Sequence, residues 1–317
     1  MSTERMLVTG GAGFIGSHVV EAALEQGWAV AALDDLSSGR RENLPGGVAL
    51  YEVDVRDAAA VAAALGDFRP TVVSHQAAQA SVSVSVREPV FDAEVNVVGG
   101  LNVLLAARAQ GVRRVVFAST GGAIYGEVPE GEQAAEDTAP RPYSPYATSK
   151  LSFEHYLETF RQQFGLDYVA LRYANVYGPR QNPHGEAGVV AIFADRLMDG
   201  EAVRVNGMAQ AGDDGCVRDY VYVSDVARAN LAAARGETPR LLNVGTGVGT
   251  TTRRLAELLA ADLGVRADLQ PAPPRAGDLQ RSVLDPAEFR RVLGEPTPLE
   301  EGLRRTAGWA RAQRQGV

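Results

Sequence analysis

The chain has 317 residues, of which 45% are hydrophobic, enough to bury a full core in one large domain or two moderate ones. A formal net charge of −8 argues against a nucleic-acid partner, and the lone cysteine, Cys216, excludes an intrachain disulfide and suits a reducing cytoplasm. The four histidines lack metal-ligand spacing, and neither an apolar leader nor a run of about 18 apolar residues is present, so we expect a cytoplasmic protein with no metal and no membrane association.

Short apolar runs alternate with longer segments through the first half of the chain. The runs cover residues 6–9, 29–33, 48–53, 71–74, 115–118 and 168–172, and the stretches between them are long enough for crossover helices. This alternation predicts an α/β fold, in which a parallel sheet carries helices on both faces. From Val176 onward prolines and glycines break the pattern, so we expect a first domain over 1–175 and a smaller mixed α/β lobe over 176–317, with a segment at about 219–247 able to return to the first domain.

A glycine-rich turn follows the first apolar run. Residues 9–16 read Thr-Gly-Gly-Ala-Gly-Phe-Ile-Gly and open an apolar helix, a context in which backbone amides and the helix N-terminus bind a pyrophosphate. Asp34 ends the next run, where its carboxylate is able to accept hydrogen bonds from a ribose diol and to repel a 2′-phosphate. The pattern predicts a doubly wound, Rossmann-type domain that binds NAD, although Arg40 and Arg41 leave NADP open as an alternative.

The only lysine of the chain is Lys150, and it follows Tyr146 by four residues. Residues four apart lie on one face of a helix, and Ser144-Pro145 is a typical N-cap and first helical position, which would put Tyr146 in the first turn. A neighbouring ammonium and the positive end of the helix dipole favour a phenolate. We therefore expect both side chains in one cleft, with the pKa of Tyr146 lowered so that it acts as a general base near neutral pH.

Together these motifs resemble the extended short-chain dehydrogenase/reductase family, and the likeness covers nearly the whole chain. Segments 117–126, 171–181 and 218–223 bring it nearest to the UDP-glucose 4-epimerases within that family. The resemblance implies an NAD-binding first domain and a UDP-sugar-binding second lobe. It also implies a homodimer in which the helix from Tyr146 to about Phe164 and the one from about Asp92 to Ala107 pair with their copies.

The resemblance also implies roles for individual residues. Thr120, Tyr146 and Lys150 would be catalytic, with Thr120 and Tyr146 at the sugar 4-hydroxyl. The cofactor would contact Gly10, Gly13, Phe14, Ile15, Gly16, Asp34, Asp35, Leu36, Ser38, Gly39, Asp54, Val55, Ala77, Ala78, Asn96, Tyr146, Lys150 and Tyr173. The substrate would contact Ser81, Thr120, Tyr146, Asn175, Val189, Arg218, Arg275, Asp278 and Ser282.

The residues after Thr120 discriminate among reactions. Sugar-nucleotide 4,6-dehydratases carry an Asp-Glu pair there, whereas this chain has Gly121 and Gly122, which indicates oxidation and re-reduction at C4 without elimination. Ser282 stands where strict hexose epimerases carry a bulky tyrosine, so UDP-N-acetylhexosamines are further candidate substrates. A UDP-uronate 4-epimerase, a keto-sugar reductase, a non-catalytic dinucleotide-binding regulator and a Schiff-base enzyme using Lys150 are the alternatives. Asp35 and the unusual stretch 206–215 depart from the family pattern.

Overall fold

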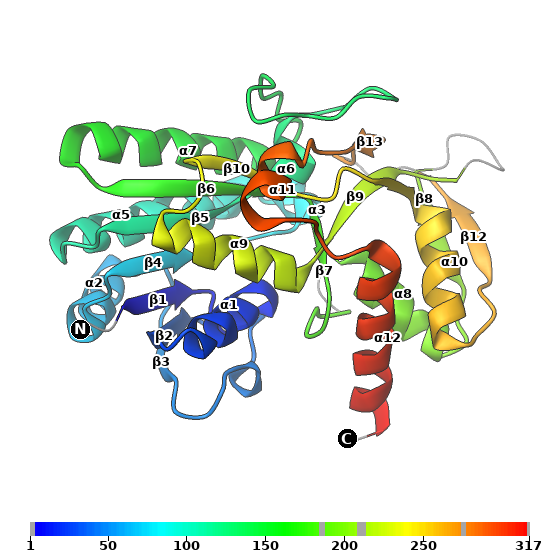
Figure 1. Ribbon diagram of the computed structural model, residues 1–317, viewed down its shortest axis with the longest axis horizontal. Coiled ribbons are helices and arrows are strands. Elements are labelled where there is room, and N and C mark those ends of the chain that lie inside the picture. Colours follow the sequence, from blue (N-terminus) through cyan, green and yellow to red (C-terminus); the bar gives the residue numbers. More distant parts are fainter. Residues whose placement is uncertain (1–3, 184–187, 208–213, 274–276, 316–317) are drawn as a thin grey trace.

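A seven-stranded parallel sheet forms the centre of the larger lobe (Figure 1). The computed structural model describes residues 4–183, 188–207, 214–273 and 277–315. The sheet has the order β10-β6-β5-β4-β1-β2-β3, and every neighbouring pair is parallel. Its strands are β1 (Arg5–Thr9), β2 (Ala29–Asp34), β3 (Ala49–Glu52), β4 (Val72–His75), β5 (Arg114–Thr120), β6 (Asp167–Tyr173) and β10 (Leu241–Val244). The predicted doubly wound fold is confirmed.

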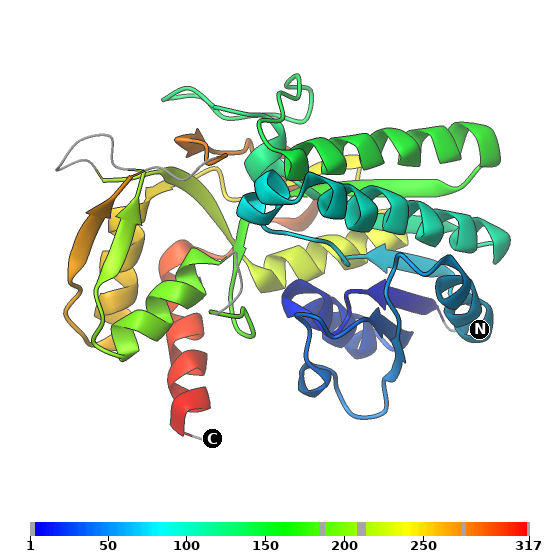
Figure 2. The ribbon, with the colours of Figure 1, turned by 180° about the vertical axis from the view of Figure 1, so that it is seen from behind.

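Helices cover both faces of this sheet (Figures 1 and 2). One face carries α1 (Phe14–Glu25) and α9 (Val223–Arg235), and the other carries α2 (Ala58–Phe68), α5 (Gly100–Ala109) and α7 (Pro145–Phe164). Consecutive strand residues point to opposite faces, so Met6 and Val8 pack under α1 and α9 whereas Leu7 packs under α2, α5 and α7. Burial of apolar residues on both sides explains why these strands are continuous hydrophobic runs.

The smaller lobe is a mixed assembly. In it β7 (Asn175–Tyr177), β9 (Val217–Tyr222), β11 (Gly249–Thr251) and β13 (Arg281–Ser282) form one sheet, and β8 (Val203–Asn206) pairs with β12 (Leu269–Ala272). The helices α8 (Val189–Met198), α10 (Thr252–Leu263) and α12 (Leu299–Gln315) enclose a core of their own. The remaining elements are η1 (Arg41–Asn43), α3 (Val82–Arg87), α4 (Pro89–Ala93), η2 (Glu94–Gly99), α6 (Gly121–Ile124) and α11 (Ala287–Leu293).

The chain passes between the lobes more than once. After β9 in the smaller lobe it forms α9 against the large sheet and then β10, which pairs with β6. The last helix, α12, lies back in the smaller lobe (Figure 1). A boundary at residue 176 stays a prediction, and the chain crosses between the lobes again after that residue.

Helical structure is continuous from Pro89 to Ala109, through α4, the π-helical segment η2, and α5. By length and composition alone this segment could cross a membrane, with a mean hydropathy of 1.4. It packs against α2 and α7, and 44% of its most apolar window is buried inside the protein. A single such helix is weak evidence for a membrane span, because core helices of soluble proteins pass the same test.

Polar contacts fix α7 against the sheet. Glu154 accepts hydrogen bonds from Arg172 of β6 at 3.0 and 2.6 Å and from the hydroxyl of Ser119 on β5 at 2.5 Å. Arg172 also donates to the hydroxyl of Tyr125 at 2.8 Å. All these side chains are buried, so the ion pair is well satisfied and sets the position of α7 along the two strands.

Glu154→Gln should lower the free energy of unfolding by about 3–5 kcal/mol, because it leaves the Arg172 guanidinium buried without its counter-charge. Urea unfolding followed by circular dichroism measures this change. Arg291→Ala, which breaks an exposed ion pair with Glu288 on α11, is the control and should leave the unfolding midpoint unchanged. Equal effects from the two substitutions would contradict the structural role of Glu154.

Candidate active site

A large cavity lies at the carboxyl ends of the sheet strands, where the smaller lobe faces them. Its volume is about 1850 Å³, larger than the roughly 300–1,000 Å³ of a pocket for one small ligand. Loops after β1, β2, β4, β5 and β6 line one side, and residues of α8, β8 and β9 line the other. The cavity therefore has room for two ligands that meet at the edge of the sheet.

The glycine-rich turn forms one wall of the cavity. Gly10 has φ +64° and donates its backbone N–H to the carbonyl of Leu33 at 2.7 Å, which holds the turn beside β2. A Cβ atom at Gly10 would lie 2.7 Å from the backbone nitrogen of Ala77, and one at Gly16 would collide with the Gly10 carbonyl. Only glycine fits at these two positions, so the backbone of the turn faces the cavity without side chains to obstruct it.

Asp34 organises this wall. Its carboxylate accepts the N–H of Ala12 at 2.9 Å and that of Leu36 at 2.9 Å, which joins the turn after β1 to the turn after β2. Burial raises the pKa of this carboxyl, and the two backbone hydrogen bonds oppose that rise. Asp34 lines the cavity where the sequence predicted a ribose contact.

The tyrosine–lysine pair lies at the start of α7. Ser144 is the N-cap, with its hydroxyl accepting the N–H of Ala147 at 3.2 Å, and Pro145 is the first helical residue, as predicted. Tyr146 lines the cavity beside Thr120, and a hydrogen bond joins their side chains. Lys150 lies behind the tyrosine: its Nζ donates to the carbonyl of Ala118 at 2.9 Å and is 5.8 Å from the centre of the Tyr146 ring.

The expected lowering of the tyrosine pKa is wrong for this structure. Burial raises the pKa of Tyr146 to about 12, the hydrogen bond with Thr120 lowers it, and the negative charge of Asp92 raises it further. Burial also lowers the pKa of Lys150 to about 8, and Asp92 opposes that fall. The nearby ammonium and the helix dipole favour a phenolate, but desolvation penalises the charged form of each group and outweighs them.

Most of the predicted contact residues line the cavity. On the cofactor side they are Gly10, Gly13, Phe14, Ile15, Gly16, Asp34, Asp35, Ser38, Asp54, Val55, Ala77, Ala78, Tyr146 and Tyr173. On the substrate side they are Ser81, Thr120, Tyr146, Asn175, Val189, Arg218 and Asp278. Their roles stay predictions, since proximity alone does not identify a ligand.

Five predicted residues do not line the cavity, and Arg275 lies outside the described residues. Leu36 contributes a backbone N–H to Asp34, and Gly39 packs so closely on that carboxylate that a Cβ would lie 2.7 Å from it. Asn96 is buried and bonds the backbone of Gln79. Ser282 is buried in β13, and Lys150 lies beneath Tyr146.

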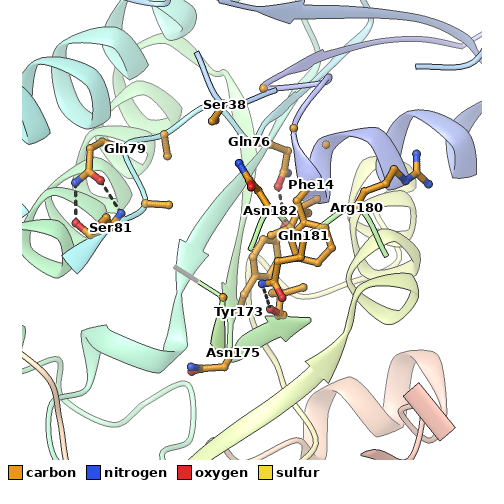
Figure 3. A pocket seen from close by; sticks show the side chains of 18 of the residues that line it. Phe14, Ser38, Gln76, Gln79, Ser81, Tyr173, Asn175, Arg180, Gln181 and Asn182 are labelled. Atoms are coloured by element: carbon orange, nitrogen blue, oxygen red, sulfur yellow. Dashed lines mark hydrogen bonds between the residues drawn. The ribbon is translucent and has the colours of Figure 1, made fainter. Parts of the chain in front are cut away.

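Several cavity residues were missed by the sequence analysis (Figure 3). Arg180, at φ +69°, donates to the carboxylate of Glu21, to His18 at 3.1 Å and to the carbonyl of Asn43 at 3.0 Å, so it ties the start of the smaller lobe to α1. Gln76, Gln79, Gln181 and Asn182 also line the cavity. Arg180 and Gln181 belong to segment 171–181, which carries the family resemblance, so that motif was a signal for these two residues.

The single lysine makes its own protonation measurable. With ¹³Cε-lysine labelling, the one resonance should titrate near pH 8 in the folded protein and near the ordinary value of about 10.4 in urea. Because the pKa is lower in the folded state, the unfolded chain binds more protons between these two values, and the contribution of Lys150 to the free energy of unfolding rises with pH there. Identical midpoints in the folded and urea-unfolded chains would contradict the burial of this ammonium.

Comparison with known proteins agrees with this geometry. The family model described as the NAD dependent epimerase/dehydratase family matches residues 6–245. A UDP-glucose 4-epimerase of Mycolicibacterium smegmatis is 45% identical over 98% of this chain and 100% of its own length. The solved UDP-glucose 4-epimerase of Thermus thermophilus, in complex with NAD, is 57% identical with a TM-score of 0.93, over 97% of this chain and 99% of that one.

The Thermotoga maritima UDP-glucose 4-epimerase, solved with UDP-glucose, is 47% identical with a TM-score of 0.92, over 98% of this chain and 99% of that one. The family match covers more than half of the chain, and the relatives match it almost from end to end. The chain belongs to the NAD dependent epimerase/dehydratase family.

Proposed function

We propose that this protein is an NAD-dependent 4-epimerase of UDP-hexoses, which interconverts UDP-glucose and UDP-galactose through a transient 4-keto sugar. The observation that carries the proposal is the hydrogen-bonded pair of Thr120 and Tyr146 on the wall of a cavity large enough for a dinucleotide and a sugar nucleotide. The names of the relatives point to the same activity.

The chain's own residues fit NAD. Cβ atoms at Gly10 and Gly16 would collide with neighbouring backbone, so glycine at these positions lets the turn pack tightly against the start of α1. Gly10, Gly13 and Gly16 line the cavity at the N-terminus of α1, where amides and the helix dipole suit a pyrophosphate. Asp34 suits a ribose diol, and of the two neighbouring arginines Arg41 is directed at Glu52, at 3.4 Å. A 2′-phosphate would meet the Asp34 carboxylate, which favours NAD over NADP.

The proton chemistry falls to Tyr146. When bound, NAD⁺ supplies a hydride acceptor for the sugar C4 and a positive charge that lowers the pKa of a neighbouring phenol. The Tyr146 oxygen takes the proton of the 4-hydroxyl and later returns it, and Thr120 holds the phenol oxygen in place by its hydrogen bond. Inversion at C4 would require loss of the hydride from one face and its return to the other, so the cavity would have to let the hexose turn while its UDP stays bound.

Steric contacts at Gly121 and Gly122, as well as the absence of an acidic pair there, disfavour elimination. A Cβ at Gly121 would lie 2.5 Å from a methyl group of Leu284, and one at Gly122 would lie 2.9 Å from the Asn175 side-chain oxygen. The acidic pair of a 4,6-dehydratase therefore does not fit at these positions without movement of their neighbours. This leaves a base, a hydroxyl donor and a hydride acceptor, which is the minimum for epimerisation at C4.

For the UDP group, we propose Arg218 and Asp278, which line the smaller-lobe side of the cavity. Arg218 donates to the carbonyls of Leu279 at 2.5 Å and Gln280 at 3.3 Å, so its guanidinium is held on the same loop as Asp278. An arginine held in this way is suited to charge-assisted contacts with a diphosphate. Ser282 does not line the cavity, so its position gives no support to a space for an N-acetyl group.

The purified protein should convert UDP-galactose to UDP-glucose without added cofactor and without net NADH, measured by chromatography of the sugar nucleotides. Tyr146→Phe should reduce kcat by on the order of 10²–10⁴, because it removes the general base. Tyr143→Phe is the matched control, since Tyr143 is exposed and lies three residues away.

The same assay is repeated with UDP-N-acetylhexosamines and with UDP-uronates as substrates. An absolute need for added NADH would point instead to a keto-sugar reductase. Turnover of UDP-uronates alone would point to a uronate epimerase. An inactive wild-type protein that retains bound NAD would favour a regulator.

We further propose a cytoplasmic homodimer. Exposed apolar side chains gather on neighbouring helices α4, η2, α5 and α7, which lie side by side (Figure 2): Val90, Val98, Leu105, Tyr156 and Phe164. Several exposed apolar side chains on adjoining helices are typical of an interface between subunits. The exposed apolar residues of the Pro89–Ala109 segment are then covered by a second copy, and we expect the protein in the soluble fraction of lysed cells.

Light scattering after size exclusion should give twice the 33.6 kDa of one chain. Val98→Asp should shift the mass toward 33.6 kDa, because a charge on this face opposes its burial. Val248→Asp, which changes an exposed valine outside these helices, is the control and should keep the wild-type mass. A wild-type mass of one chain at micromolar concentration would reject the dimer.

A further inference from the structure

A buried carboxylate that the proposed chemistry does not use lies next to the active-site helix. Asp92, on α4, has no exposed surface. It accepts hydrogen bonds from the Ser149 hydroxyl at 2.6 Å, the Gln79 amide at 2.8 Å and the Asn96 amide at 3.0 Å. All three donors are neutral, and burial of an anion is costly unless its charge is compensated. The position of Asp92 therefore needs a reason beyond packing.

Through these hydrogen bonds Asp92 joins two parts of the active site. Ser149 precedes Lys150 on α7, so one oxygen of Asp92 holds the helix that carries the tyrosine–lysine pair. The other oxygen holds Gln79, whose side chain also accepts the backbone N–H of Ser81 at 2.6 Å (Figure 3). Gln79 and Ser81 both line the cavity, so helix and loop are fixed to the same carboxylate.

Within the described part of the chain, the Lys150 ammonium forms no direct ion pair with a carboxylate. It donates to the Ala118 carbonyl and lies 4.9 Å from the centre of the Phe117 ring. Asp92 acts on it through space: its negative charge raises the pKa of Lys150 and also that of Tyr146. The anion thus compensates the one buried ammonium of the site.

Other titratable groups around this pair do not supply that charge. His75, on β4, is kept neutral by burial, which lowers its pKa to about 3. Tyr173, on β6, is neutral because burial raises its pKa to about 12. On the same strand, Arg172 is already paired with Glu154 of α7. The other charged residues on the elements packed against α7 are partly or fully exposed: Arg87, Glu94, Arg108, Arg114 and Asp167.

We propose that Asp92 is a positioning residue of the epimerase site, whose buried carboxylate fixes α7 to the loop that carries Gln79 and serves as the counter-charge of the Lys150 ammonium. The expected effect on catalysis rests on the proposed function. The expected effect on the pKa of Lys150 depends only on side chains of this protein. Asp92 thus combines two roles, and a substitution that keeps the shape and removes the charge distinguishes them.

Asp92→Asn is that substitution. The asparagine oxygen is able to accept from the Gln79 and Asn96 amides, and its NH₂ group is able to donate to the Ser149 oxygen once that hydroxyl rotates. The hydrogen-bonded links then survive while the charge is lost. In the ¹³Cε-lysine titration, the Lys150 midpoint should move below the wild-type value of about 8. The pH profile of kcat for UDP-galactose should move to lower pH as a whole, since both Tyr146 and Lys150 lose the anion that raises their pKa.

Two controls separate charge from structure. Glu88→Gln removes an exposed carboxylate four residues before Asp92. It should leave both the Lys150 titration and the pH profile of kcat unchanged. Ser149→Ala removes one hydrogen bond but keeps the anion, so it should lower activity at every pH without moving the Lys150 midpoint to lower pH. Should Asp92→Asn not fold, Asp92→Ser gives a second uncharged variant that carries a hydroxyl, and the same shift is expected.

Coincident Lys150 titrations for wild type and folded Asp92→Asn would overturn the counter-charge role. A uniform loss of kcat with an unmoved pH profile would reduce Asp92 to a structural residue. If the wild type fails to turn over any UDP-sugar, the proposed function fails, but the lysine titration still tests the electrostatic role, so the two failures are distinguishable.

Discussion

The fixed position of α7 is the constraint on which the rest of the site depends. Its first turn must bring Tyr146 against Thr120 at the end of β5, and both belong to elements that other contacts hold in place. Glu154 fixes the middle of the helix to β5 and β6 through Ser119 and Arg172. Ser149 fixes its beginning to α4 through Asp92. A helix held at both points has little freedom to slide, so the phenol oxygen keeps its place at the cavity wall.

Burial, more than the nearest charge, governs the electrostatics of the pair. Lys150 is buried and Tyr146 is half-buried at the cavity wall, and desolvation pushes each of them toward its neutral form. A base that must ionise in such a place depends on positive charge brought by the ligand, and an ammonium that must stay charged depends on a buried anion. A positively charged ligand in the cavity would therefore favour the ionised form of Tyr146.

The smaller lobe completes the cavity and is tied to the larger one at several places. Arg180 anchors its first loop to α1, and the return of the chain through α9 and β10 adds a second connection. The smaller-lobe side of the cavity, with Arg218 and Asp278, is therefore held in a defined position relative to the larger lobe.

Features that depend on neighbouring residues could be predicted from the amino-acid sequence. The parallel sheet follows from apolar runs at regular intervals, and the glycine-rich turn from glycines spaced between a strand and a helix. The position of Tyr146 follows from the cap at Ser144 and the helical segment after it. Each of these features is encoded in a short stretch of sequence, where residue propensity and hydrophobic periodicity determine local structure.

Features that join distant segments of the chain became visible only in the folded protein. The contact between Asp92 and Ser149 spans 57 positions, and that between Arg180 and His18 spans 162. Burial, which set the pKa of Tyr146 opposite to the local expectation, is the sum of many such contacts. Periodicity identifies which face of a segment is buried but not which segment covers it, and so neither the partners of a charge nor its desolvation can be read from the residues beside it.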